Sequence, residues 1–244
     1  MHAGFSLLAL IPARSGSKGL PNKNVLNCAG KPLIEWTIAA AHGAVEIDEI
    51  IVSTDSENIA AVSANAGASV PFIRPASLAA DNSSMLDVIK HAWENHLDSN
   101  GRYFDYVVLL QPTSPLRSST HISEAIRLYF RSRRSDEDTL ASVHPVNSKY
   151  GWLMERVGTG GYIEFCRDVR QENPQRQELP SFFLPNGAIF VIKGDNIAGG
   201  IYHSSTLSYV MDPRDSIDID TQEDFRLAEE TLRSRCDLEI SRSS

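Results

Sequence analysis

The chain is 244 residues long, 42% hydrophobic and acidic, with a formal net charge of -8. A chain of this size can bury an ordinary core, which excludes a fibre or a disordered chain and predicts one large domain. The acidic balance disfavours general binding to nucleic acid or to an anionic membrane, because both require a broad basic surface. Cys28, Cys166 and Cys236 show no short metal-ligand spacing, so we expect reduced thiols in a cytoplasmic protein.

The apolar run at residues 5–11 is predicted to form the first strand. It is too short to span a bilayer and no basic segment precedes it, so we interpret it as a strand rather than a membrane helix or a secretory signal. It leads into Pro12 and a turn rich in glycine and basic residues. A helix should begin at Pro32 and end near Gly43, because proline suits the first helical position and glycine the position after the last.

Strands and helices alternate along the next part of the chain. Short apolar or β-branched runs predict strands at residues 49–53, 69–74 and 106–110. Helical periodicity predicts three helices: one at residues 59–66, one that begins after a cap at Ser84, and one through residues 122–130. Such alternation is typical of an α/β domain with a parallel sheet, whose ligands bind beyond the carboxyl ends of the strands.

The alternation breaks between about residues 139 and 183. Residues 152–157 and 162–165 flank a turn of glycines, which predicts two antiparallel strands in a small inserted lobe at about residues 142–183. The sheet is predicted to resume at residues 187–193 and 207–211 and to continue into the run at 215–220. A last helix should then be capped by Thr221.

The turn after the first strand is the strongest functional signal. Gly16 and Gly19 allow the backbone to bend and its N–H groups to approach an anion, and positive charge comes from Arg14, Lys18 and Lys23. The turn matches neither the Walker motif nor the Gly-x-Gly-x-x-Gly dinucleotide motif, which disfavours an ATPase or a dehydrogenase. A solvated basic loop is the alternative, but cations and glycines directly after a first strand favour phosphate binding.

Asp218 and Asp220 alternate around Ile219, so in an extended segment both carboxylates project to one face. Paired carboxylates suit Mg²⁺, which takes one or two of them together with waters and substrate phosphates. The spacing leaves a second interpretation equally open, in which the pair lies on an exposed edge or caps the helix at Thr221. A position at the end of a strand favours the metal site.

Other polar residues follow the predicted strands and also have structural alternatives. Asp55 either binds a metal or a sugar or caps the helix that starts near Ser56, and we prefer the cap. Gln111 is a candidate for orienting a polar substrate, whereas Arg117 either shares that role or pairs with an acid. No Ser-His-Asp triad or reactive cysteine is apparent, so the cations and carboxylates point to phosphoryl or nucleotidyl transfer.

Four motifs carry a resemblance over nearly the whole chain. The first motif, residues 11–24, is Ile-Pro-Ala-Arg-Ser-Gly-Ser-Lys-Gly-Leu-Pro-Asn-Lys-Asn, and the second, residues 110–117, is Leu-Gln-Pro-Thr-Ser-Pro-Leu-Arg. The third, residues 185–190, is Pro-Asn-Gly-Ala-Ile-Phe, and the fourth, residues 216–220, is Ser-Ile-Asp-Ile-Asp. They resemble the acylneuraminate cytidylyltransferases, the CMP-N-acetylneuraminic acid (CMP-sialic acid) synthetases, and the related enzymes for legionaminic and pseudaminic acid. The resemblance implies a single nucleotidyltransferase domain over residues 1–244, with a Rossmann-like, mostly parallel sheet flanked by helices, of the nucleotide-diphospho-sugar transferase type. It also implies that CTP and a nine-carbon 2-keto sugar acid react to give the CMP-sugar and pyrophosphate.

The resemblance assigns roles by position. CTP binding is implied for Ala13, Arg14, Ser15, Gly16, Lys23, Asn24 and Ser84. Sugar binding is implied for Gln111, Lys149, Arg176, Phe190 and Asp220. Mg²⁺ binding is implied for Asp218 and Asp220, and catalysis for Arg14, Lys23 and Asp220. Asp220 would stand close enough to the anomeric hydroxyl of the sugar to orient or deprotonate it.

The inserted lobe of the similar family crosses to a second subunit, where its basic residues complete the sugar site. Lys149 and Arg176 match two such positions, so the resemblance implies a homodimer. Leu184 stands where sialic acid enzymes often carry Arg, and Phe190 replaces a frequent Tyr; both changes remove polar contacts to the sugar. We expect sialic acid or a close relative as the substrate, with legionaminic or pseudaminic acid as the alternative. A nucleotide-binding regulator without turnover is the rival, which intact Lys23 and the two aspartates disfavour.

Overall fold

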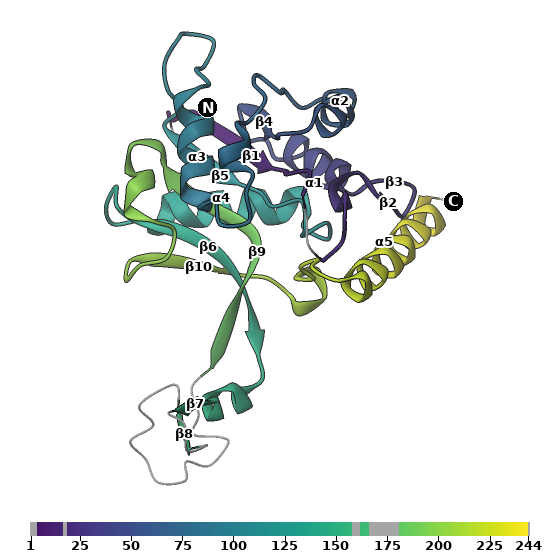
Figure 1. The fold of residues 1–244 in the computed structure, drawn as a ribbon, viewed down its shortest axis with the longest axis vertical. Coiled ribbons are helices and arrows are strands. Elements are labelled where there is room, and N and C mark those ends of the chain that lie inside the picture. Colours follow the sequence, from purple (N-terminus) through teal and green to yellow (C-terminus); the bar gives the residue numbers. More distant parts are fainter. Residues whose placement is uncertain (1–3, 17–18, 158–161, 166–180, 244) are drawn as a thin grey trace.

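A computed structural model describes residues 4–16, 19–157, 162–165 and 181–243. Its centre is a six-stranded sheet with the strand order β10-β6-β9-β5-β1-β4 (Figure 1). The strands are β1 (Leu7–Pro12), β4 (Glu49–Ser53), β5 (Tyr106–Leu109), β6 (Thr139–Val146), β9 (Phe182–Lys193) and β10 (Thr206–Val210). Neighbouring strands are parallel except β9, which is antiparallel to β5 and β6, so the predicted mostly parallel α/β sheet is confirmed.

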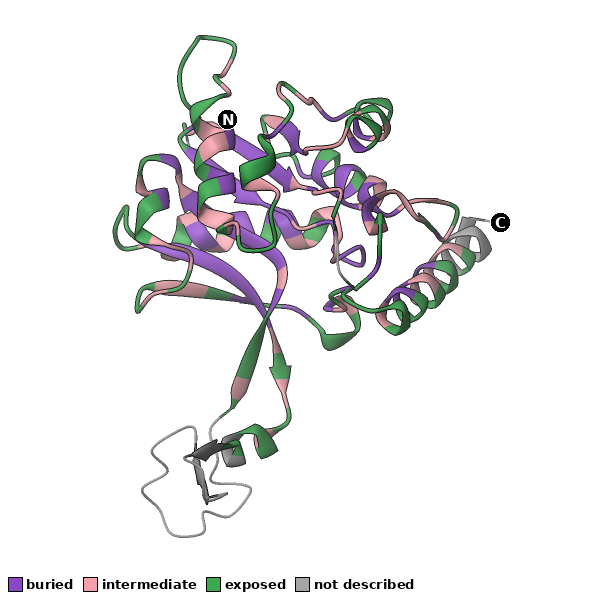
Figure 2. Ribbon diagram, in the orientation of Figure 1, coloured by how far each residue is buried: buried purple, intermediate pink, exposed green. Residues whose placement is uncertain are grey.

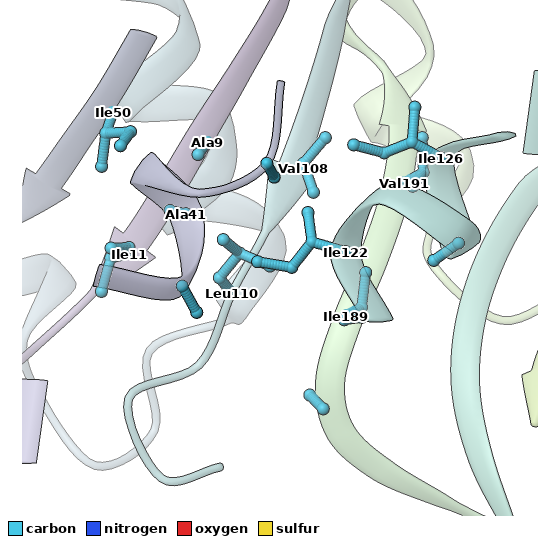
Figure 3. Packing of buried hydrophobic residues seen from close by; sticks show 14 of the residues in the cluster. Ala9, Ile11, Ala41, Ile50, Val108, Leu110, Ile122, Ile126, Ile189 and Val191 are labelled. Carbon is cyan, nitrogen blue, oxygen red and sulfur yellow. The ribbon is translucent and has the colours of Figure 1, made fainter. Parts of the chain in front are cut away.

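Helices cover both faces of the sheet. The helices are α1 (Leu33–His42), α2 (Glu57–Asn65), α3 (Met85–Glu94), α4 (Ser119–Ser132) and α5 (Gln222–Ser243), of which α5 lies away from the sheet (Figure 1). Successive side chains of a strand point to opposite faces, and β1 accordingly serves two cores. Ala9 and Ile11 pack in one core with residues of α1 and α4 (Figure 3), whereas Leu8 and Leu10 pack in the other with residues of α3. The sheet is buried between these layers (Figure 2), as the unbroken apolar sequence of β1 predicts.

A third and smaller core lies below the turn that follows β1. Its buried members include Leu20 from that turn, Ile219 from the aspartate run and Phe225 from α5. The hairpin of β2 (Asn27–Cys28) and β3 (Lys31–Pro32) follows the short helix η1 (Lys23–Val25) and leads into α1. These contacts bring the first and the last motifs of the sequence together. In the described ranges no helix is both long and apolar enough to cross a membrane.

The strand predicted at residues 69–74 is wrong. Two isolated bridges join this segment to the edge of the sheet, between Ile51 and Ser69 and between Thr54 and Ile73. Pro71 lies between the two bridges and has no N–H group to donate to a neighbouring strand. The segment therefore touches the sheet edge at two points and carries Arg74 past the carboxyl end of β4.

β6 and β9 continue beyond the sheet as a two-stranded ribbon that carries the inserted lobe (Figure 1). Residues 139–143 of β6 pair with β10 inside the sheet, so the predicted break in the alternation begins too early. β9 begins at Phe182 rather than at the predicted residue 187. The register of the two strands shifts between Ala141 and Val143, and the ribbon extends beyond this irregularity. In the lobe, β7 (Met154–Val157) and β8 (Tyr162–Phe165) pair antiparallel as predicted.

The run at residues 215–220 is not part of the sheet, in contrast to the prediction. It follows a short helix, η6 (Pro213–Asp215), and is otherwise irregular. The N–H of Ile219 donates to the carbonyl of Thr113 at 2.9 Å, and this bond fixes the run beside the loop after β5. Thr221 then caps α5 as predicted, because its Oγ1 accepts the N–H of Asp224 at 3.2 Å. The helix cap is thus made without the side chains of Asp218 and Asp220.

Candidate active site

A pocket of about 420 Å³ opens at the carboxyl ends of β1 and β5, the edge at which the alternating pattern predicts a ligand. The turn after β1, the loop after β5, a stretch within residues 74–88 and the aspartate run form its wall. Six predicted site residues line it: Arg14, Lys23, Asn24, Gln111, Asp218 and Asp220. Cations from the first motif and carboxylates from the last therefore share one pocket.

Lys23 joins the basic turn to the aspartate run. Its Nζ donates to the carbonyl of Ile219 at 2.6 Å and lies 3.3 Å from Asp220 Oδ1. Gly19 allows the turn to lie directly against the backbone of the aspartate run, because a Cβ at this position would overlap the carbonyl oxygen of Asp220. The turn and the run are consequently packed against each other, and the positive and negative groups face the same opening.

Arg14 lies elsewhere on the pocket wall. Its Nη1 is 2.9 Å from Asp81 Oδ1 and donates to the carbonyl of Ala79 at 3.5 Å. Both charged side chains of the Arg14–Asp81 pair are partly exposed, so water and salt weaken the pair. The Arg14 carbonyl accepts a hydrogen bond from Nδ2 of buried Asn24 at 3.0 Å. Asn24 therefore fixes the backbone at Arg14, while the guanidinium group can exchange its partner for a ligand.

Asp218 and Asp220 both face the pocket although their segment is irregular. Water reaches Asp218 from the pocket, but the surrounding protein desolvates its carboxyl group and raises its pKa, and the charge of Asp220 adds to the rise. A divalent cation would relieve both effects. Across the described residues no group of three or more His, Cys, Asp or Glu side chains is arranged to hold a metal. The pair fits Mg²⁺, which needs only one or two carboxylates when phosphates and waters supply the rest.

Gln111 lies against the backbone of β9 at Gly187. The φ angle of Gly187 is 70°, a conformation that favours glycine. A Cβ at this position would lie 2.8 Å from Gln111 Oε1 and 3.5 Å from Asp218 Oδ2. Glycine thus allows the β9 backbone to approach both side chains, so a larger residue at Gly187, the third position of the motif Pro-Asn-Gly-Ala, would be strained and would clash with Gln111.

Four predicted nucleotide residues have positions behind or beside the pocket. Ala13 is fully buried, and Ser15 and Gly16 belong to the turn without lining the pocket. Ser84 caps α3, where its Oγ accepts the N–H of Leu86 at 3.2 Å, as the capping alternative predicts. The neighbouring Ser83 lines the pocket instead.

The predicted sugar residues are less closely grouped. Phe190 is buried in the core, 3% exposed, with its ring 5.8 Å from that of Tyr202, and it does not line the pocket. Lys149 lies exposed in the short helix η3 (Ser148–Trp152) of the lobe, at the end of the ribbon (Figure 1). Leu184 is exposed on the ribbon itself. Arg176, like Lys18 and Cys166, lies outside the described residues.

Comparison with known proteins agrees with this geometry. A family model described as Cytidylyltransferase matches residues 8–149, more than half of the chain. The N-acylneuraminate cytidylyltransferase of Escherichia coli O18:K1:H7 is 37% identical over 224 residues, which cover 91% of this chain and 51% of the relative. The CMP-N,N'-diacetyllegionaminic acid synthase of Legionella pneumophila is 36% identical over 93% of this chain and 96% of the relative. The chain belongs to the cytidylyltransferase family.

The extent of these matches differs between relatives. The chain spans about half the length of the Escherichia coli relative and nearly all of the Legionella relative. Among solved structures, CMP:2-keto-3-deoxy-manno-octonic acid synthetase complexed with CTP matches with a TM-score of 0.70 and 15% identity, over 94% of this chain and 99% of that chain. At this low identity the similarity shows the fold alone, and it confirms the predicted nucleotidyltransferase type of sheet.

Two residues in or beside the pocket were not predicted in their observed roles. Arg74 lines the pocket, is 4% exposed, and its Nε has no hydrogen-bond partner among the described residues. Asp55 does not cap α2, so the preferred cap is wrong; Ser56 caps that helix by accepting the N–H of Ile59 at 3.4 Å. Asp55 binds Ser15 instead. The sequence signal for Asp55 is its place just after the predicted strand at residues 49–53, whereas Arg74 falls within the strand predicted at residues 69–74 and has no such signal.

Arg117 supports the pocket from within the core. It is buried, and its Nη1 donates to the carbonyl of Gln111 at 3.1 Å and to that of Ala188 at 2.8 Å. Burial lowers the pKa of Arg117 to about 9. Arg117 therefore holds the loop after β5 against β9 through backbone carbonyls, in place of the acid partner that the sequence suggested.

Proposed function

We propose that this cytidylyltransferase transfers the cytidylyl group of CTP to a nonulosonic acid, N-acetylneuraminic acid or a close relative, and releases pyrophosphate. The observation that carries the proposal is the convergence of Arg14, Lys23, Asp218 and Asp220 on one pocket. The names of the Escherichia coli and Legionella relatives support a sugar acid of this class.

The basic turn would bind the triphosphate. The anomeric hydroxyl oxygen attacks the α-phosphorus, the bond from that phosphorus to the bridging oxygen breaks, and the pyrophosphate carries the negative charge away. Arg14 grips phosphate oxygens through its planar guanidinium group, and Lys23 adds a point charge. Such transfers depend mainly on positioning and charge stabilisation, which is what this set of residues supplies. Phosphates replace Asp81 as the partner of Arg14 at little cost, because that pair is exposed.

Asp218 and Asp220 would hold Mg²⁺, which when bound neutralises charge on the phosphates. Asp220 has a second role in this proposal as the acceptor of the proton from the sugar hydroxyl. Its side chain is exposed to the pocket and lies 3.3 Å from the Lys23 ammonium group, which orients the carboxylate. Gln111, next to Gly187, would orient the sugar.

A homodimer would complete the sugar site. The ribbon and the lobe expose large apolar side chains that one chain leaves uncovered: Tyr150, Leu153, Met154, Phe183 and Leu184. An apolar surface of this kind marks an interface, and a symmetric dimer covers it with the same surface of a second copy. Lys149 lies on that lobe and would reach the partner's pocket together with Arg176. We place the protein in the cytoplasm, where CTP is available.

The identity of the sugar acid is left to two candidates. The Legionella relative is as similar as the Escherichia coli relative, and their names specify different acids. Leu184 stands where sialic acid enzymes often carry Arg, so the ribbon lacks a positive side chain at this position. This difference makes legionaminic acid the second candidate after N-acetylneuraminic acid. Phe190 stands where the similar family often has Tyr, and its side chain packs in the core of this chain.

The decisive test measures pyrophosphate release with CTP, Mg²⁺ and a panel of purified acids: N-acetylneuraminic, legionaminic and pseudaminic acid. We expect release that requires CTP and one of these acids. Binding of CTP without release for any member of the panel would favour the nucleotide-binding regulator.

The dimer has a test of its own. Sedimentation should give twice the mass of one chain, and Leu153→Glu should give monomers with weakened use of the sugar acid.

A further inference from the structure

Asp55 makes two hydrogen bonds to the residue that follows Arg14. Its Oδ1 accepts the N–H of Ser15 at 2.8 Å, and its Oδ2 accepts from Ser15 Oγ at 2.6 Å. The two residues lie on neighbouring strand ends, because Pro12 of β1 is paired with Ser53 of β4. A single carboxylate therefore ties the basic turn to the end of the adjacent strand.

The same carboxylate also contacts the buried arginine of the pocket wall. Asp55 Oδ1 lies 3.9 Å from Arg74 Nη2, and the Arg74 side chain is 3% exposed. A buried cation without a nearby anion carries a large desolvation penalty. Asp55 thus stabilises Arg74 in its charged form next to the pocket while it holds Ser15.

Gly16, the residue after Ser15, is exposed. A Cβ at Gly16 would find no atom within 4 Å, so the chain is open to solvent at that point. Gly19 lies directly against the backbone of Asp220. The two bonds to Ser15 are the attachment at the beginning of this stretch, directly after the residue that would grip phosphate.

We propose that Asp55 is a positioning residue for CTP, which sets the basic turn and Arg74 in the geometry that receives the nucleotide. The inference rests on the proposed function, since it names CTP as the ligand. Asp55 does not touch the nucleotide; it acts through Ser15 and Arg74. Burial opposes ionisation of Asp55, but the hydrogen bonds from Ser15 and the charge of Arg74 outweigh it and lower the pKa, so the carboxylate stays charged at neutral pH.

The chain contains a matched control at the other end of β1. Asp105 Oδ2 accepts the N–H of Ser6 at 2.7 Å and Ser6 Oγ at 2.9 Å. The chemical groups are the same as at Asp55, and the site is at the amino end of the strand, away from the pocket. Asp105→Asn therefore removes the same charge and weakens the same kind of contact without touching the turn.

The experiment compares Asp55→Asn with Asp105→Asn in the full chain. CTP affinity is measured by calorimetry, KM is measured for CTP and for the sugar acid, and the melting temperature is measured for both variants. We expect Asp55→Asn to weaken CTP binding and to raise KM for CTP by roughly 10-fold or more, with KM for the sugar acid changed less than about 2-fold. Asp105→Asn should leave both KM values unchanged even if its melting temperature falls.

A second variant protects the test against misfolding. Ser15→Ala keeps the charge of Asp55 and its contact with Arg74 and removes only the Oγ bond, so KM for CTP should rise by roughly 3-fold. Normal CTP affinity in Asp55→Asn, or equal changes for both substrates that follow the loss of melting temperature, would overturn the inference. A wild-type chain that binds no CTP would overturn the proposed function as well, so the two failures are distinguishable.

Discussion

The two ends of β1 carry the same pair of side chains in different surroundings. Ser6 donates to Asp105 through its N–H and Oγ at the amino end, and Ser15 donates to Asp55 in the same way at the carboxyl end. At the amino end the next N–H group, that of Leu7, donates to Asp48 Oδ2 at 2.9 Å. The two carboxylates thus accept the first N–H groups at the beginning of the strand. At the carboxyl end the bonded turn borders a pocket.

The pockets at the two edges show the same contrast. The smaller one, of about 270 Å³, lies at the amino edge, where Asp48 accepts the N–H of Leu7 and Glu49 lies 2.8 Å from His96. In the larger one, charged side chains on the pocket wall pair with each other, Lys23 with Asp220 and Arg14 with Asp81. A carboxylate that accepts a backbone N–H stabilises the fold. A charged side chain that is paired with an exposed side chain remains available to a ligand.

The largest effect should come from Asp220→Ala. It removes a carboxylate from the place where negative charge develops, and kcat should fall about 10² to 10³-fold. Its exposed side chain contributes little to stability, and Lys23 keeps its bond to Ile219, so the melting temperature should not change.

Asp136→Ala is the control for this variant at the amino edge. Asp136 is an exposed partner of Lys193 at 2.9 Å, as Asp220 is of Lys23. Its removal should leave kcat unchanged. Equal losses in the two variants, measured by pyrophosphate release, would contradict the distinction between the edges.

Arg14→Ala should act mainly on nucleotide binding. Loss of the phosphate-gripping guanidinium group should raise the Kd for CTP roughly 10 to 100-fold, in the range for a hydrogen-bonded charge. Stability should be retained, because its pair with Asp81 is exposed. The Kd is measured by calorimetry, with Arg102→Ala as the control, because that variant also loses an ion pair between an exposed arginine and an aspartate. The comparison separates the effect of removing any surface positive charge from the effect of removing Arg14. Unchanged CTP affinity in Arg14→Ala would show that the phosphate site is elsewhere.

Glu46→Gln should change stability and leave nucleotide binding intact. Burial alone would raise the pKa of Glu46, but hydrogen bonds from Ser123 Oγ at 2.6 Å and Arg127 Nε at 2.7 Å outweigh it and lower the pKa. A lowered folded-state pKa stabilises the fold above the unfolded-state pKa, and this contribution is lost as the pH falls through the folded value.

Urea denaturation should therefore show Glu46→Gln to be less stable by about 1–2 kcal/mol at pH 7, with a difference that shrinks in acid. The Kd for CTP should match that of the wild type, because Glu46 precedes β4 on the amino side of the sheet. A gap in stability that widened as the pH fell would contradict the sign of this argument.

Asp81→Asn should have the smallest effect. It releases Arg14 from an exposed ion pair worth at most about 1 kcal/mol, so CTP should bind tighter by no more than about 5-fold. Salt screens exposed charges, and the gain should therefore be smaller at high ionic strength. Weaker CTP binding in calorimetric titrations at low salt would show that Asp81 itself helps to hold the nucleotide.

Much of the fold could be predicted because its strands and helices have clear local patterns. β1 and β5 are short apolar runs, and α3 and α4 have one apolar face. β6 was missed because its sequence includes Thr139 and Ser142, and what keeps it in the sheet is distant in sequence. Ser142 Oγ donates to Asn186 Oδ1 at 2.5 Å, 44 residues away, and such pairing cannot be inferred from local periodicity.

The candidate site divides in the same way. Arg14, Lys23 and the aspartate run could be proposed because glycines, cations and carboxylates stand directly in the sequence motifs. Asp55 and Arg74 could not be placed, because their roles depend on β4 lying next to β1 in the sheet. Strand order is a property of the whole fold, and the local sequence around Asp55 fits a helix cap equally well.

A crystal structure with CTP and Mg²⁺ bound tests the central claim most directly. The account predicts a triphosphate between Arg14 and Lys23 on one side and Asp218 and Asp220 on the other, with Asp55 still bonded to Ser15. Nucleotide density away from this carboxyl edge, with the four charged side chains still paired within the protein, would contradict it.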